Sequence, residues 1–150
     1  MTDQIDAIDL LVREHRAIDA LAAQLDDTDD PAEIDRLFRR IVEMLAAHEA
    51  MEHEVIFPAF RAAIHDGSDH TIDRREGEHE ELNDVIAEMQ SLAPDSFGFE
   101  KRASALLLDV RGHMEREEES VFARMRELMT ADALADLGAR AGAVQQRTTA

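Results

Sequence analysis

The sequence contains no cysteine, no tryptophan and no tyrosine, and it has only 6 glycines and 3 prolines among 150 residues. The lack of cysteine excludes disulfides, thiolate metal sites and thiol nucleophiles. The lack of tyrosine excludes a phenolate ligand and a tyrosyl radical. Few helix breakers, together with abundant Ala, Leu, Glu, Asp and Arg, favour an all-α chain.

Positive charge and long apolar runs are also scarce. The sequence has 16 Lys and Arg residues against 34 Asp and Glu residues, a formal charge of −18. This excess argues against nucleic acid and anionic membranes as partners. No apolar run approaches the ~20 residues of a membrane-spanning helix, and residues 1–9 lack the basic segment of a secretory signal. We therefore expect a cytoplasmic protein.

Apolar residues at three- and four-residue steps predict four long helices in a single domain, 1–150. The predicted helices span about Asp3–Leu25, Pro31–Ile64, Ile72–Leu92 and Phe99–Leu128. Pro58 is expected to kink the second helix or end its regular part, because its ring clashes with the carbonyl four residues earlier.

Short connections favour antiparallel neighbours, so we predict an antiparallel up-and-down four-helix bundle over about residues 3–128. Thr130 is a suitable cap for a short fifth helix, from Ala131 to about Ala141. Residues 145–150 are predicted to form a frayed tail, which makes 129–150 a short helix and tail.

A histidine and a glutamate four residues apart occur twice, as His48 with Glu52 and as His113 with Glu117. Positions i and i+4 share one face of a helix, and both pairs lie on the apolar face. An unpaired carboxylate buried there would be costly. The two glutamates therefore require a neutralising partner.

The chain also repeats with a spacing of about 65 residues. Glu14-His15 corresponds to Glu78-His79, and the His48 pair corresponds to the His113 pair. Each of the four helices thus carries one histidine near its middle. In an antiparallel bundle the middles of the four helices lie at the same level along the bundle axis. Six groups should therefore converge: His15, His48, Glu52, His79, His113 and Glu117.

Mixed imidazole and carboxylate ligands suit iron or manganese, and zinc less exclusively. Two buried carboxylates suit the bridging of two metal ions, and six protein ligands leave two octahedral ions with open positions. A single histidine on an apolar stripe is more often an ordinary core residue, but four on four stripes with two matched glutamates favour metal ligation. A ferritin-like site is rejected, because its Glu-x-x-His pattern occurs only at Glu76 and His79.

These motifs resemble the hemerythrin-like, HHE cation-binding domain family over about residues 3–128. The resemblance implies a four-helix bundle that holds two non-haem iron ions with an oxo or hydroxo bridge. It implies that His15 and His48 bind one iron and that His79 and His113 bind the other. Glu52 and Glu117 would bridge the two ions.

Two positions depart from the oxygen-carrying hemerythrins. Those proteins have a second histidine one turn before the one matched to His79, where this chain has Arg75. They also use an aspartate five residues after the last histidine, where this chain has Glu118, with Glu117 the better candidate. Glu49 and Glu76 are open as additional ligands. His53 is expected to face outward or to lie just behind the metal ligands.

The resemblance implies a protein that binds or reacts with hydrogen peroxide, dioxygen or nitric oxide. Fewer histidine ligands leave more open coordination, which favours peroxide or oxygen chemistry, such as peroxide disproportionation during oxidative stress, over oxygen storage. The alternative is a sensing or binding module for oxygen, nitric oxide or iron without turnover. A metal-free or zinc-filled bundle that acts through its surface is a third hypothesis. The oligomeric state is left open.

Overall fold

The computed structural model describes residues 5–64 and 67–149, and within them all regular structure is helical. The helices are α1 (Ala7–Asp26), α2 (Pro31–Met51), α3 (Phe57–Ala63), α4 (Thr71–Gln90), α5 (Phe99–Glu117), α6 (Ala123–Leu128) and α7 (Ala131–Thr149). Two π-helical turns, η1 (Glu52–Ile56) and η2 (Glu118–Phe122), join α2 to α3 and α5 to α6. None of the described helices is long and apolar enough to cross a bilayer.

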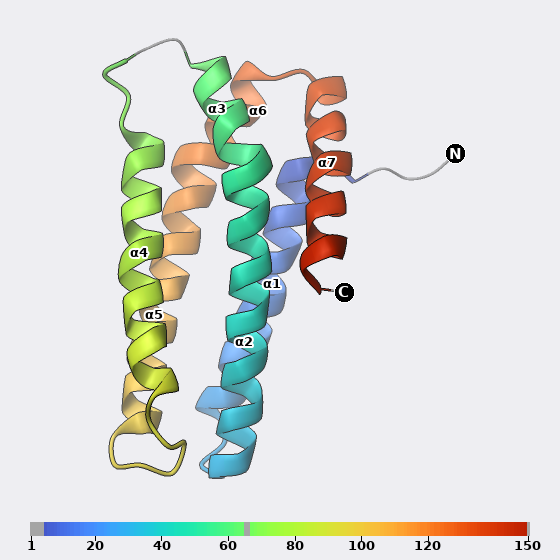
Figure 1. Cartoon of the computed structure of the whole chain (residues 1–150). Helices are drawn as coiled ribbons and strands as arrows, with labels where there is room; N and C mark the ends of the chain where they lie inside the picture. The colour runs from blue at the N-terminus through green and yellow to red at the C-terminus, as the bar shows by residue number, and fades with distance from the viewer. Residues whose placement is uncertain (1–4, 65–66, 150) are drawn as a thin grey trace.

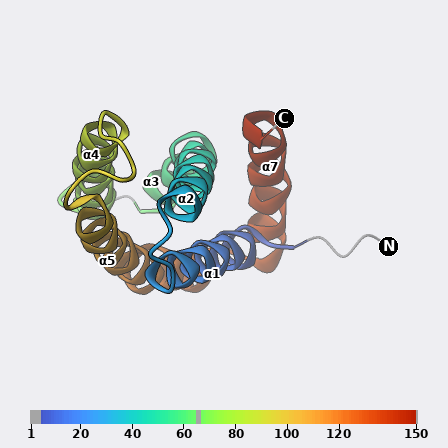
Figure 2. The ribbon, with the colours of Figure 1, turned by 90° about the horizontal axis from the view of Figure 1, so that it is seen from below.

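Four helical rods run alternately up and down: α1, α2 with α3, α4, and α5 with α6 (Figure 1). Seen along their axes, they form a four-cornered bundle, and α7 stands outside it against α1 and α2 (Figure 2). The expected all-α, antiparallel up-and-down four-helix bundle with a fifth C-terminal helix is therefore confirmed. The first helix begins at Ala7, capped by the Asp6 side chain, and the expected start at Asp3 lies outside the described residues.

The second and fourth rods each contain one π-helical turn at the same relative position. The N–H of Phe57 donates to the carbonyl of Glu52, and the N–H of Ala123 donates to that of Glu118, each five residues back. Pro58 follows the first turn, whereas no proline follows the second. The irregularity thus precedes Pro58 and does not depend on a proline. Single π turns of this kind often mark functional sites.

The apolar core is divided into two clusters along the bundle. One surrounds Leu11, Phe57 and Phe122 at the end that α7 covers. The other surrounds Ile18, Leu37 and Leu107 towards the opposite end. The predicted ligands lie between these clusters in sequence, so each rod changes from apolar to polar and back to apolar at the same level.

The fifth helix corrects the prediction for the C-terminal part. Thr130 caps it as expected, since its Oγ1 accepts a hydrogen bond from the N–H of Ala133 at 3.1 Å. The helix is not short, however: it has 19 residues, and its apolar face buries Leu134, Leu137, Ala141 and Val144. Residues 145–149 are helical and not a frayed tail, while residue 150 lies outside the description. Packing against α1 and α2 stabilises the longer helix.

Candidate metal centre

Each of four rods contributes one buried histidine to the middle of the bundle. His15 comes from α1, His48 from α2, His79 from α4 and His113 from α5, and none is more than 4% exposed. Their Nε2 atoms face inward in two pairs. The distance from His15 to His48 is 3.0 Å, and that from His79 to His113 is also 3.0 Å.

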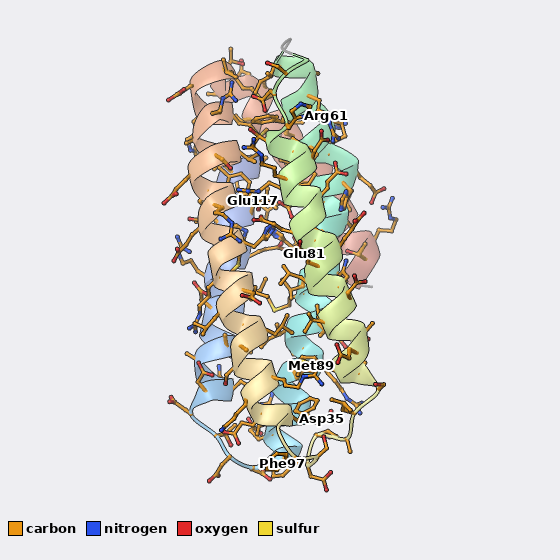
Figure 3. The ribbon with its side chains drawn as sticks, turned by 90° about the vertical axis from the view of Figure 1, so that its left-hand side faces the viewer. Asp35, Arg61, Glu81, Met89, Phe97 and Glu117 are labelled. Carbon is orange, nitrogen blue, oxygen red and sulfur yellow. The ribbon has the colours of Figure 1, made fainter. Side chains whose placement is uncertain are left out.

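Two fully buried glutamates lie beside these pairs. Glu117 has one oxygen 3.2 Å from Nε2 of His15 and the other 3.6 Å from Nε2 of His113, so its carboxylate spans both pairs. Glu52 Oε1 lies 3.4 Å from His48 and 3.2 Å from His79, and so also touches both pairs. The structure thus brings together all six residues singled out in the sequence. Figure 3 shows Glu117 in the space between α4 and α5.

The outer ring nitrogens fix the orientation of the imidazoles. Three Nδ1 atoms lie within 2.9 Å of carboxylate oxygens: His15 at Glu118, His48 at Glu14 and His113 at Glu78. A carboxylate only accepts, so these Nδ1 atoms carry a proton, and in the neutral form of each imidazole the Nε2 lone pair points inward. The fourth histidine, His79, has Nδ1 3.2 Å from Nε2 of His53.

In this arrangement the Nε2 acceptors of the imidazoles face one another and face the carboxylate oxygens of Glu52 and Glu117. Inward lone pairs of two imidazoles cannot approach to 3.0 Å without a proton or a cation between them. Both oxygens of Glu52 and one oxygen of Glu117 are buried without a hydrogen-bond partner among the described residues. A buried carboxylate without a partner is costly. Imidazole and carboxylate donors that meet in this way fit divalent transition-metal ions.

Without a metal, the carboxylates and imidazoles would compete for protons. Burial, reinforced by the neighbouring Glu117, raises the pKa of Glu52 well above its usual range. Burial opposes ionisation of Glu117 as well, but its contacts with Glu52, His15 and His48 outweigh burial and lower its pKa.

Two of the histidines also have pKa values that shift in opposite directions. Burial disfavours the charged form of His48, but hydrogen bonds to Glu117 and Glu14 prevail and raise its pKa to about 9. Burial, together with the nearby His113, lowers the pKa of His79 to about 3. In the absence of a metal, these shifts favour protonation of Glu52 and His48 and disfavour protonation of Glu117 and His79.

Aromatic rings close both sides of the cluster. Phe57 stacks on His79 with 5.8 Å between ring centroids, and Phe122 stacks on His15 at 5.6 Å. Both phenylalanines are at most 2% exposed. The π turns bring these rings over the imidazoles, because an added residue shifts the side chains that follow it around the helix. The rings exclude water and restrict imidazole rotation.

The other candidate ligands do not join the six. Glu76 pairs with Arg61 at the surface, at 2.7 Å. Glu49 accepts a hydrogen bond from Asn83, and burial raises its pKa. Arg75 is buried at 8% exposure beside Glu78, with 3.0 Å between its Nε and Glu78 Oε1. Arg75, one helical turn before His79, thus contributes positive charge in place of a ligand.

Residues 6–138 match the sequence profile described as the hemerythrin HHE cation-binding domain. The chain belongs to this family. The buried cluster of histidines and glutamates is compatible with the cation binding for which the family is named.

Two known proteins resemble this hemerythrin-like domain. A hemerythrin HHE cation-binding-domain-containing protein from Mycobacterium kansasii shares its fold, with a TM-score of 0.83 at 20% identity over 96% of this chain and 87% of the other. A protein named DNA nickase, from Nostoc sp., is 25% identical over 124 residues, 83% of this chain. The chain spans only 34% of that relative's length.

Sequence reasoning did not identify the carboxylates that contact the outer imidazole nitrogens of this hemerythrin-like domain. Glu14 and Glu78 each precede a histidine in the sequence but orient the histidine of the next rod. The sequence did contain a signal for this role, because Glu14 and Glu78 occupy equivalent positions in the two halves of the repeat. Glu118 orients His15 across the bundle, a contact that only the packing of α1 against η2 defines.

Proposed function

We propose that the chain is a non-haem di-iron protein whose metal centre reacts with a small oxidant, most simply hydrogen peroxide. His15 and His48 would bind one iron, and His79 and His113 the other. Glu52 and Glu117 would bridge the two ions. The observation that carries this proposal is the convergence of four Nε2 atoms on two buried carboxylates with unpartnered oxygens.

The donor set favours iron over its competitors. Imidazole suits iron, zinc and copper, whereas carboxylates shift the preference towards harder ions. Two carboxylates that each touch both histidine pairs suit two ions with bridging ligands. With six protein ligands, octahedral ions retain positions for solvent and for a small exogenous ligand. Zinc fits this donor set less well, and manganese ranks behind iron because the family resemblance implies iron.

The surface near the cluster favours small uncharged molecules. A groove of about 280 Å³ between α4 and α5 reaches His113 and is lined by Glu78, Glu81 and Asp109, among others. Figure 3 shows Glu81 on α4. Three carboxylates against the one guanidinium of Arg116 leave this lining net negative, which disfavours anions, whereas hydrogen peroxide, dioxygen and nitric oxide pass without an electrostatic penalty.

The chain's own residues would prepare the centre for this chemistry. A bound iron pair would supply the redox capacity. Glu14, Glu78 and Glu118 would hold the imidazoles with Nε2 inward, and such supporting contacts increase ligand basicity. The stacked rings of Phe57 and Phe122 would keep bulk water away.

The name of the Nostoc relative does not extend to this proposal. It describes a protein of which this chain matches a third, and a formal charge of −18 opposes binding to a phosphate backbone. A sensing or binding role without turnover is the alternative at the same centre.

Anaerobic reconstitution with ferrous iron tests the proposal. The full chain should bind two irons and, after oxidation, show oxo-bridged ferric absorption bands that change when peroxide is added. Oxygen should evolve from peroxide faster than with free iron, and Glu52→Ala should abolish both signals. Reversible spectral change without turnover would favour sensing. Substoichiometric iron after reconstitution would refute the di-iron centre.

A further inference from the structure

The internal two-fold relation of the bundle makes the two histidine pairs comparable position by position. A shift of 64 residues relates His15 to His79 and Glu14 to Glu78. A shift of 65 residues relates Glu52 to Glu117 and also His53 to Glu118. The six converging residues thus have identical counterparts, whereas the residue behind one histidine of each pair does not.

Behind the His15–His48 pair, the outer nitrogens meet only carboxylates among the residues that the structure describes. Glu118 Oε2 lies 2.9 Å from Nδ1 of His15, and Glu14 Oε2 lies 2.9 Å from Nδ1 of His48. One guanidinium, that of Arg16, pairs with Glu118 at 2.8 Å, but it is 60% exposed. Water therefore screens this positive charge, and the surroundings of the pair are net negative.

Behind the His79–His113 pair, the chemistry differs. Nδ1 of His79 lies 3.2 Å from Nε2 of His53, so an imidazole takes the place of a carboxylate. His113 meets Glu78, but two guanidinium groups also contact this carboxylate: Arg75 at 3.0 Å and Arg116 at 2.6 Å. Arg75 is only 10% exposed, so its charge is poorly screened.

The Arg75 position is itself asymmetric. Its counterpart in the other half is Leu11, which is fully buried in the apolar core. The groups that contact the outer ring nitrogens, or pair with the carboxylates that do, thus comprise two carboxylates and one guanidinium in one case, and one carboxylate and two guanidiniums in the other. Arg16 and Arg116 are both at least half exposed and are screened by water, and Glu49 adds a carboxylate near His53 and His113. The buried guanidinium of Arg75 is therefore the main difference in charge between the two pairs.

We infer that His53 and Arg75 make the two metal positions unequal, so that the His79–His113 position binds its ion second and more weakly. A carboxylate that accepts from the outer nitrogen makes an imidazole a stronger ligand, and a neutral acceptor does so less. The buried guanidinium of Arg75, which has no charged counterpart behind the other pair, also disfavours a nearby cation. This inference rests on the proposed two-metal function and assigns positioning roles to residues that do not touch the metal.

Anaerobic titration of the chelator-treated full chain with ferrous iron, and with cobalt as a spectroscopic probe, tests the inference. The wild-type protein should bind two ions in two resolved steps, with the second about tenfold or more weaker, which is the usual range for supporting contacts. His53→Glu supplies the carboxylate found at the counterpart Glu118 and should tighten the second step about tenfold. The first step should not move.

Two further variants separate charge from packing. His53→Gln places an uncharged amide at this exposed position and should leave the two steps apart. Arg75→Leu introduces the residue of its counterpart Leu11 and should tighten the second step only. Two equal steps in the wild type, or a His53→Glu variant that alters the first step alone, would overturn the inference while the two-metal function stands. Failure to bind any metal would overturn both.

Discussion

At the scale of single residues, Glu52 and Glu117 are chemically identical and equally buried, yet they contribute differently to the metal-free protein. Burial and the neighbouring Glu117 raise the pKa of Glu52, which favours its neutral form. The pKa of Glu117 is lowered, because imidazoles stabilise its charge. Replacing Glu52 and replacing Glu117 should therefore change the stability of the metal-free protein in opposite directions.

Glu52→Leu should raise the free energy of unfolding of the metal-free protein by about 1–3 kcal/mol. It removes two buried oxygens without partners at similar side-chain volume. Glu117→Leu should lower this free energy by about 3 kcal/mol, because buried histidines lose their counter-charge. Denaturant unfolding of chelator-treated proteins measures both. Equal destabilisation by the two variants would contradict the assigned charge states.

His48 should make the metal-free protein less stable in alkali. Its pKa rises from 6.5 in the unfolded chain to about 9 in the fold. The resulting stabilisation is complete below pH 6.5 and is lost as the pH passes through about 9, a change of about 2–3 kcal/mol. Unfolding free energies at pH 7 and pH 9.5 measure it, and His48→Gln should flatten the dependence. The lowered pKa of His79 affects stability only below pH 6.5, so it does not contribute to the change between pH 7 and pH 9.5.

At the scale of elements, the two π turns explain why the periodicity of the sequence predicted the rods but not their detail. The i, i+4 spacing of His48 with Glu52 and of His113 with Glu117 fixed the inward face, which is why all six converging residues were predicted. The register beyond each glutamate shifts by one residue, and no local signal marks that shift. An irregularity is expected at Pro58 because of its ring, but the equivalent π turn before Ala123 forms without a proline.

Pro58→Ala should keep both the π turn and the metal centre. Its counterpart is Ala123, which follows an identical turn without a proline. Since the Pro58 side chain is exposed, the free energy of unfolding should change by no more than about 1 kcal/mol. Thermal unfolding and metal content of the variant check this expectation. Loss of metal with an intact fold would show that the proline is required for the ligand geometry.

At the scale of the whole molecule, the polar cluster lies between two apolar clusters, and α7 completes one of them. The length of α7 could not be read from the sequence, because its last turns contain few apolar residues. Gln145 shows why these turns are helical: it donates to Glu14, which in turn orients His48. The C-terminal helix therefore contributes to both the core and the candidate metal centre.

Two glycines of α7 test how closely this helix docks. A Cβ on Gly138 would lie 2.3 Å from the carbonyl oxygen of Ile5, whereas a Cβ on Gly142 would meet open space. Gly138→Ala should therefore destabilise the protein by about 1–3 kcal/mol, because the backbone before α1 must move. Gly142→Ala should stabilise it by about 0.5–1 kcal/mol through helix propensity. Similar effects of the two substitutions on thermal unfolding would contradict the close docking.

The central claim is that six residues from four rods hold two iron ions, and the metal content of the reconstituted full chain tests it most directly. The account predicts two irons per wild-type chain after removal of excess metal. It predicts much less than two for Glu52→Leu, a variant expected to be more stable without metal, so that unfolding cannot explain the loss. Equal iron in the two proteins, or none in the wild type, would contradict the account.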